Sequence, residues 1–258
     1  MRITVLLENT KIREDLACEH GLSLYIETGD KRILFDAGQT GAFADNAEKL
    51  GIDLKSVDFA VLSHGHYDHS GGLIRFLSLN PTTPIYLSRH AFGPHYNASG
   101  KFIGVDPALA ESPRLVFVDD YRELAPGLAL HSTLVPRFPT DTCGLTHLEE
   151  DILLPEDFRH EQYLLIEEAG NRICISGCSH RGILNIASQF QPDVLIGGFH
   201  FMKLDPDSPA LTHAAETLME YPTVYYTGHC TGESQYTRLK AYMGRQLHRL
   251  STGITFEI

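Results

Sequence analysis

Residues 63–72 read Ser-His-Gly-His-Tyr-Asp-His-Ser-Gly-Gly and place three imidazoles and one carboxylate within six positions. Neutral imidazole nitrogens and carboxylate oxygens are ligands that zinc and similar ions accept. Residues 59–62, which precede the stretch, are all apolar and are typical of a buried strand. We therefore predict a metal-binding loop at the end of a strand, in preference to a polar surface turn.

The spacing of these side chains divides them into two pairs. His64 and His66 are two residues apart, and side chains with this spacing project to the same side of an extended chain, so both can bind one ion. Asp68 and His69 come after the chain turns, where the glycines of the stretch are expected to give backbone freedom. This second pair faces a second ion more naturally, so the stretch predicts a two-metal site.

The composition limits the classes of function. A chain of 258 residues with 43% hydrophobic residues can form a globular domain with its own core. No segment approaches the roughly 20 apolar residues of a membrane span, and we expect a cytoplasmic protein without membrane contact. The net charge of −12 disfavours a nucleic-acid partner, whereas bound divalent ions would make a pocket locally positive and suit a small anionic substrate. The five cysteines, an odd number, do not indicate a disulfide framework.

Apolar periodicity and turn residues predict alternating strands and helices, as in a layered α/β fold. Strands are expected at 2–7, 22–27, 32–36, 57–62, 84–87, 162–167, 172–176, 193–196 and 224–227. Helices are expected at 42–50, 72–79, 183–190 and 211–219.

The segment at about 88–161 is rich in Pro, Gly and charged residues. We interpret it as an irregular insertion in a single domain that spans 1–258. Long irregular connections are often lids or binding loops, so a lid over a substrate is the preferred interpretation. A surface excursion or a contact in a homodimer is the alternative.

The pattern His64-x-His66-x-Asp68-His69, with Ile-Leu-Phe-Asp-Ala-Gly at 33–38, resembles the metallo-β-lactamase superfamily of hydrolases. Further segments at 21–27, 46–51, 176–180, 197–200 and 228–232 resemble one branch of it. Many members of that branch carry the label 7,8-dihydropterin-6-yl-methyl-4-(β-D-ribofuranosyl)aminobenzene 5'-phosphate synthase. The resemblance implies an αββα four-layer sandwich of two mixed β-sheets flanked by helices.

The remaining ligands are expected after later strands. Cys178 stands where many superfamily members have a bridging Asp, and a thiolate can replace that ligand. His180 lies two residues further on and is the leading candidate for the third ligand of the first ion. The superfamily's usual third histidine corresponds to the region of His131, but no Gly turn follows it here. Three alternatives are open: His131 is the ligand, His180 replaces it, or the first ion has an incomplete ligand shell and binds weakly.

Three more residues are assigned roles. His229 matches the family's last ligand and should join Asp68 and His69 on the second ion. His200, after Gly-Gly-Phe, is expected to stabilise a developing oxyanion or to hold a substrate phosphate. Asp36 is expected to accept N–H groups of the metal loop or to orient a ligand imidazole without binding the ion itself.

Two divalent ions, zinc in preference to iron or manganese, would supply a water of lowered pKa, with Asp68 orienting it. This predicts a metal-dependent hydrolase of a small phosphorylated or cyclic-ester metabolite. The first alternative is the C–N bond-forming synthase that the branch label implies. The second is a metal-bound ligand sensor without turnover.

Overall fold

The computed structural model describes residues 1–258, and the chain divides into two compact units. Unit 1 comprises Met1–Asp119, Gly144–Gln162 and Ser251–Ile258. Unit 2 comprises Asp120–Cys143 and Tyr163–Leu250. Each unit contains one seven-stranded sheet, and unit 1 contains a three-stranded sheet in addition.

The large sheet of unit 1 is mixed, with the strand order β17-β1-β2-β3-β4-β5-β7. The pairs from β17 to β3 are antiparallel, and β3, β4, β5 and β7 are parallel. The strands are β1 (Arg2–Leu7), β2 (Ser23–Thr28), β3 (Lys31–Phe35), β4 (Phe59–Val61), β5 (Ile85–Ser88), β7 (Leu115–Val118) and β17 (Thr255–Glu257).

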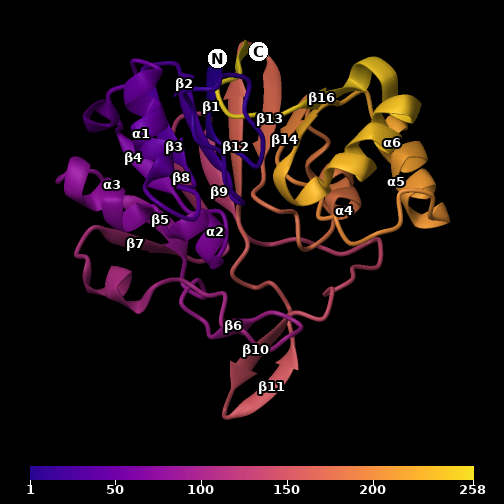
Figure 1. Cartoon of the computed structure of the whole chain (residues 1–258), viewed down its shortest axis with the longest axis horizontal. Helices are drawn as coiled ribbons and strands as arrows, with labels where there is room; N and C mark the ends of the chain where they lie inside the picture. Colours follow the sequence, from indigo (N-terminus) through magenta and orange to yellow (C-terminus); the bar gives the residue numbers. More distant parts are fainter. The chain divides into compact units, whose positions relative to one another are not determined.

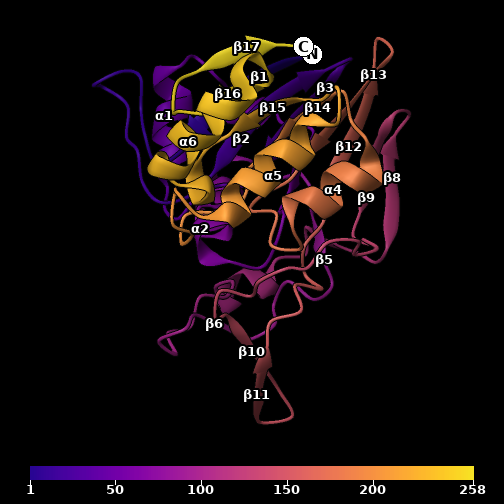
Figure 2. The same cartoon turned by 90° about the vertical axis from the view of Figure 1, so that its right-hand side faces the viewer.

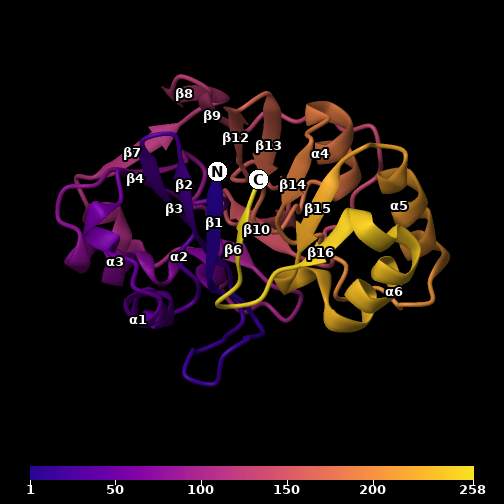
Figure 3. The same ribbon diagram turned by 90° about the horizontal axis from the view of Figure 1, so that it is seen from above.

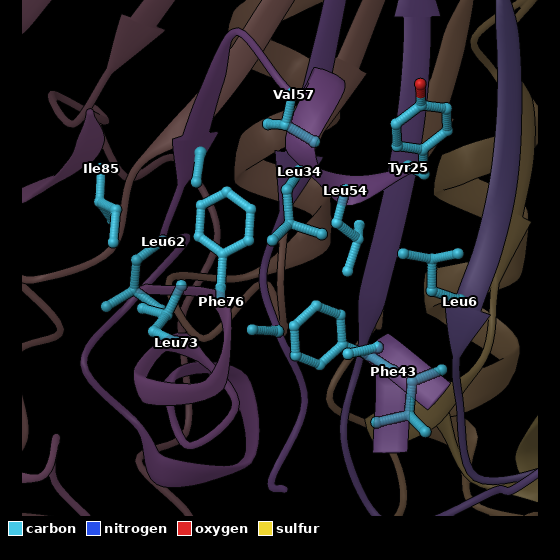
Figure 4. Packing of buried hydrophobic residues seen from close by; sticks show 14 of the residues in the cluster. Leu6, Tyr25, Leu34, Phe43, Leu54, Val57, Leu62, Leu73, Phe76 and Ile85 are labelled. Carbon is cyan, nitrogen blue, oxygen red and sulfur yellow. The ribbon is translucent and has the colours of Figure 1, made fainter. Parts of the chain in front are cut away.

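Helices α1 (Ala42–Lys49) and α3 (Leu73–Leu79) cover one face of this sheet (Figures 1 and 3). The helical spacing of α1 places Phe43 and Ala47 on its buried side. Figure 4 shows Phe43 and Phe76 packed among strand residues such as Leu34. Shorter helices are η1 (Leu54–Ser56), α2 (Tyr67–Ser70) and η2 (Pro107–Glu111). This core supports the strand ends from which the metal loop emerges.

The small sheet of unit 1 has the order β11-β10-β6. Its strands are β6 (His95–Tyr96), β10 (Thr146–Glu149) and β11 (Ile152–Pro155). β10 and β11 form an antiparallel hairpin, and β6 pairs with the other edge of β10 (Figure 2).

The sheet of unit 2 has the order β16-β15-β14-β13-β12-β9-β8. β13, β14, β15 and β16 are parallel, and the other neighbours are antiparallel. The strands are β8 (Tyr121–Ala125), β9 (Leu128–His131), β12 (Tyr163–Glu168), β13 (Asn171–Ile175), β14 (Val194–Ile196), β15 (Val224–Thr227) and β16 (Leu247–Arg249).

The helices of unit 2 lie against this sheet, as Figure 2 shows for α4, α5 and α6 in front of β14 and β15. They are α4 (Ile183–Phe190), α5 (Pro209–Met219), η3 (His229–Thr231), α6 (Glu233–Met243) and η4 (Gly244–Gln246). α5 begins as its sequence predicts, because the Ser208 hydroxyl accepts the Leu211 N–H and Pro209 occupies the first turn. None of the helices combines the length and apolar character that a membrane span requires.

The α/β class and the two mixed sheets with their helices are confirmed. All the predicted strands and helices outside 88–161 are present, with bounds shifted by at most about two residues. The segment 88–161 differs from the expected irregular insertion, because it contains the six strands β6 to β11. β7 extends the sheet of unit 1, and β8 and β9 belong to the sheet of unit 2. Its role as a lid stays a prediction.

Candidate metal centre

The metal loop, residues 63–72, follows β4 in unit 1 and leads into α2. His66 is the residue before the first turn of α2, and Asp68 and His69 lie in that turn. All four candidate ligands of the loop are buried. The ring centroid of His64 is 4.6 Å from that of His66 and 4.2 Å from that of His69. Unit 1 therefore brings the three imidazoles of the motif together.

The carboxylate of Asp36, which directly follows β3, is the hydrogen-bond acceptor of this loop. Its Oδ1 accepts the backbone N–H of Ser63 at 2.7 Å. Its Oδ2 accepts the Ser63 hydroxyl at 2.7 Å and Nδ1 of His69 at 2.6 Å. Asp36 is fully buried and has a positive φ of 58°. Asp36 therefore holds the start of the metal loop and the ring of His69, and its role in orienting a metal ligand stays a prediction.

These hydrogen bonds select the tautomers of two ligand imidazoles. The single hydroxyl proton of Ser63 goes to Asp36, so Ser63 Oγ accepts from Nδ1 of His64, 2.8 Å away. His69 likewise carries a proton on Nδ1, which it donates to Asp36. In the neutral form each ring therefore has its lone pair on Nε2, the arrangement in which a carboxylate orients a ligand histidine.

The buried environment also decides the protonation of the loop. Burial, followed by the proximity of His160, holds the pKa of His66 well below its ordinary value, so this imidazole is neutral at pH 7. Burial acts to lower the pKa of His69 too, but the carboxylates of Asp36 and Asp68 outweigh it and raise that pKa. The neutral imidazole of His66 and the buried carboxylate of Asp68 are a donor set that fits a divalent cation.

The glycines after the ligands serve close approach and not backbone freedom. Gly71 and Gly72 have helical φ values of −60° and −73°. A Cβ at Gly71 would lie 2.1 Å from the carbonyl oxygen of Gln39, and one at Gly72 would lie 2.1 Å from that of Ala37. The metal loop can therefore pack directly on the backbone that follows β3. The expectation that these glycines provide conformational freedom was wrong.

Three residues near the loop were missed by sequence reasoning. Nε2 of His20 lies 3.3 Å from Asp68 Oδ2. Nδ1 of His160 accepts the backbone N–H of Gly65 at 2.8 Å. The backbone N–H of Gln162 donates to the carbonyl of Ser63 at 2.8 Å, and its side-chain amide donates to that of Leu62 at 2.8 Å. No local sequence signal identifies His160 and Gln162, which lie about a hundred residues after the loop.

In unit 2, the other candidate residues follow three adjacent parallel strands, β13, β14 and β15. The carboxyl ends of parallel strands meet at one edge of a sheet, where ligands commonly bind. Backbone hydrogen bonds join the loops there: Gly198 N–H donates to Gly177 O at 2.8 Å, and Met202 N–H donates to Cys230 O at 3.0 Å. The structure thus brings the strand-end residues of unit 2 to one edge of its sheet.

Cys178 and His180 follow β13 and are buried. The Cys178 carbonyl accepts the Cys230 thiol at 3.4 Å. The ring of His180 lies 4.2 Å from that of His200, centroid to centroid. All five cysteines of the chain are free thiols.

His200 and His229 follow β14 and β15, and both have left-handed backbone conformations, with φ values of 58° and 50°. Ser179, between Cys178 and His180, has a φ of 56°. Such conformations cost about 1–3 kcal/mol each in residues other than glycine, and they concentrate at functional sites. Together with Asp36, four of the five strand-end loops that carry candidate residues contain one such position, and the metal loop after β4 contains none.

A cavity of about 530 Å³ in unit 2 is lined by His180 and His200. Its other walls are mainly apolar, with Phe138, Ile183 and Phe201 among them. Cys143 and Lys203, which the sequence analysis did not select, also line it, and Lys203 Nζ donates to the carbonyl of Cys143 at 3.1 Å. The cavity is large enough for a small organic molecule.

His131, the alternative third ligand, lies within β9. Its ring packs edge-on against Tyr121 at 4.8 Å and Phe190 at 5.7 Å between centroids. Burial lowers its pKa. Within unit 2, His131 is thus part of an aromatic cluster, whereas His180 lies beside His200 and lines the cavity.

Comparison with known proteins extends these observations. Residues 16–158 match the family model of the metallo-beta-lactamase superfamily. The chain is 30% identical over 243 residues to the 7,8-dihydropterin-6-methyl-4-(beta-D-ribofuranosyl)-aminobenzene-5'-phosphate synthase of Methanocaldococcus jannaschii, covering 83% of this chain and 81% of that protein. It is 26% identical over 247 residues to the uncharacterized protein MJ0448 of the same organism, covering 92% and 93%.

A solved structure is similar over the full length. Tm1679, a metal-dependent hydrolase of the beta-lactamase superfamily, superimposes with a TM-score of 0.86 at 28% identity, and the match covers 100% of this chain and 99% of that one.

Proposed function

Since this chain belongs to the metallo-β-lactamase superfamily, we propose that it is a metal-dependent hydrolase of a small anionic metabolite, either a phosphate ester or a cyclic ester. The resemblance described from the sequence is confirmed by these matches. The similarity to Tm1679, a metal-dependent hydrolase, supports the reaction class.

The observation that carries the proposal is the hydrogen bonding of Asp36. One buried carboxylate receives Ser63 and His69, and through Ser63 it also fixes the ring of His64. These hydrogen bonds place the proton of each neutral ring on Nδ1, so that Nε2 is the nitrogen that could bind an ion. Orientation of ligand histidines by a carboxylate explains this arrangement.

We assign the ions by donor type. His64 and His66 would bind a first divalent ion, and Asp68 and His69 a second one. Cys178, His180 and His229 of unit 2 are the proposed further ligands, because each is a buried side chain with a soft or borderline donor at the end of a parallel strand. Zinc suits this nitrogen, oxygen and thiolate set best, with iron and manganese as the alternatives.

Bound divalent ions supply a water of lowered pKa and stabilise the negative charge that develops on the substrate. The chain's own contribution is to orient and to bind. The Asp68 carboxylate would orient the attacking water by accepting its proton in a hydrogen bond. The imidazole of His200 would donate a hydrogen bond to the oxygen that gains charge. The apolar walls of the unit 2 cavity would hold the body of the substrate, and Lys203 would pair with an anionic group.

One specific observation favours a second candidate function. The relative from M. jannaschii, 30% identical to this chain, is named as the synthase of a dihydropterin-linked ribofuranosyl-aminobenzene phosphate. The same residues could orient a phosphorylated ribose for formation of a C–N bond instead of hydrolysis. A substrate with an apolar ring and a phosphate would fit the mixed lining of the cavity in either case.

A reconstitution experiment separates these functions. The protein is dialysed against a chelator, reloaded with zinc, iron or manganese, and assayed with bis(4-nitrophenyl) phosphate, 4-nitrophenyl phosphate and a γ-lactone. We expect hydrolysis of at least one ester to depend on the added metal. If no ester is hydrolysed while the reloaded protein forms a C–N bond between an aminobenzene ribose phosphate and a pterin, the hydrolase proposal is wrong and the synthase replaces it.

A further inference from the structure

Unit 1 contains a second group of ionisable side chains outside the metal loop. His95 lies on β6 and His147 on β10, directly opposite each other in the antiparallel pair. Glu156, Asp157 and His160 follow β11. His95, Glu156 and His160 are deeply buried, and His147 is 9% exposed. The mechanism proposed for the metal centre uses none of them.

Glu156 is the centre of this group and is held as an anion. Its Oε2 accepts Nδ1 of His95 at 2.7 Å, and its Oε1 accepts the backbone N–H of Phe158 at 3.2 Å. Burial acts to raise the pKa of Glu156, but His160 and His95 outweigh it and lower that pKa below its ordinary range. Burial lowers the pKa of His160 to about 4, so this neighbour is neutral at pH 7. A buried negative charge therefore faces a neutral imidazole.

His147 is the side chain that indicates a missing ligand. Neither of its ring nitrogens has a hydrogen-bond partner. Nδ1 lies 3.7 Å from Glu156 Oε1, which is too far for a hydrogen bond. Ligand atoms at about 2.0–2.2 Å from a tetrahedral zinc ion lie roughly 3.3 Å apart, so the spacing is close to that of two ligands of one ion.

We propose that His147, Glu156 and Asp157 bind a divalent metal ion, zinc by their donor types, at a site separate from the metal loop. One ligand atom from each of the three lies within 4.8 Å of the others. Asp157 Oδ2 faces Nε and Nη2 of Arg159 at 2.7 and 2.6 Å, whereas Oδ1 accepts only the backbone N–H of Arg159 and retains a lone pair for an ion. All three ligands line a cavity of about 320 Å³, which has room for the water that completes the coordination.

His95 and His160 support the carboxylate but do not bind this ion. Nδ1 of His160 accepts the N–H of Gly65, so the proton of the neutral ring is on Nε2, 3.6 Å from Glu156 Oε1. A nitrogen that carries a proton cannot be a ligand. His95 donates its Nδ1 proton to the other oxygen of Glu156. The hydrogen bond from His95 therefore holds Glu156 in place for the ion, and the ring of His160 packs beside the same carboxylate.

The location of the site gives it a structural role. His147 is on β10, while Glu156 and Asp157 follow β11, so one ion would close the base of the hairpin. His160, which lies beside Glu156, accepts the backbone N–H of Gly65, between the first two histidines of the metal loop. The ion would thus fix the small sheet next to the metal loop. The rival arrangement is a protonated His147 paired with Glu156 and with Glu149, whose Oε2 is 3.7 Å from Nε2.

Zinc content decides between the two arrangements. The full-length protein and the variants His147→Ala, Asp157→Asn and Glu156→Gln are loaded with zinc, dialysed against metal-free buffer and analysed by inductively coupled plasma mass spectrometry. The control is His90→Ala, because exposed His90 lines the same cavity without belonging to the group. We expect each ligand variant to contain about one zinc fewer per chain than the wild type, and the control to match the wild type.

Equal zinc content in the wild type and in His147→Ala would overturn the proposal and favour the ion pair. The test does not depend on the proposed function. Even if the metal loop binds no zinc, the His147→Ala variant should contain about one equivalent of zinc fewer per chain than the wild type. Glu156 is buried, so its variant can fail to fold. His147→Ala and Asp157→Asn, at less buried positions, then give the result. Zinc should also raise the melting temperature of the wild type more than that of His147→Ala.

Discussion

The two units present their candidate ligands in different ways. In unit 1, four candidate ligands lie within six residues, and one buried carboxylate, Asp36, holds His69 directly and His64 through Ser63. In unit 2, the candidates extend from Cys178 to His229, and backbone hydrogen bonds between three strand-end loops bring them to one sheet edge. The first arrangement is encoded locally, whereas the second depends on the parallel order of β13, β14 and β15.

This difference predicts that variants in the metal loop have the largest effects. We expect His66→Ala to lower kcat/KM for the best ester by on the order of 10³-fold, because loss of an ion removes several kcal/mol of transition-state stabilisation. The measurement is a steady-state rate at saturating zinc. His131→Ala, at an imidazole inside an aromatic cluster, is the matched control and should retain the wild-type rate. A His66→Ala rate within about twofold of the wild type would contradict the assignment.

The next prediction concerns the third ligand of the first ion, in unit 2. His180 lines the cavity beside His200, whereas His131 packs between Tyr121 and Phe190. We expect His180→Ala to weaken zinc binding by roughly 10²-fold, a loss of about 2.7 kcal/mol, and His131→Ala to leave it unchanged. Competition with a fluorescent zinc chelator measures both affinities. The opposite order would assign the ligand to His131.

A smaller effect is expected at Asp36, which orients ligands without binding the ion. Asp36→Asn should weaken zinc binding about 10–100-fold, because the amide can no longer accept all of its present hydrogen bonds. Asp58→Asn is the control, since exposed Asp58, directly before β4, also accepts a backbone N–H, that of Arg32 in β3 at 2.7 Å. The same competition assay applies. Equal affinities of the two variants would show that Asp36 has only a structural role.

The smallest expected effect is that of His200. We expect His200→Ala to lower kcat roughly 10-fold, about 1.4 kcal/mol, because it removes one hydrogen bond to a group that becomes charged. Its zinc content should stay at the wild-type value, which separates it from the ligand variants. Loss of zinc in this variant would make His200 a ligand instead.

Local signals explain what could be predicted from the sequence. The motif from His64 to His69 lies in one loop, and the run of apolar residues before it identifies β4. Asp36 could be selected because it ends a strand that pairs with β4. Two other sets of contacts could not be predicted: that of His160 with Gly65, and those of Gln162 with Ser63 and Leu62. They join residues about a hundred positions apart in the sequence.

The segment 88–161 shows the same limit. Its strands β8 to β11 are short, and β11 is exposed at every position, so apolar alternation gives little signal there. The sequence could not decide between His131 and His180 either. That choice depends on which side chain packs against Phe190 and which lies beside His200. Such contacts follow from the order of the strands and not from the residues next to each histidine.

The metal content of a double variant tests the central claim most directly. His66→Ala with Asp68→Asn removes one proposed ligand from each ion of the metal loop and leaves the His147 site intact. We predict that it contains about two equivalents of zinc fewer per chain than the wild type after identical loading and dialysis. An unchanged zinc content would contradict the account, because the metal loop would then not be where this protein binds its ions.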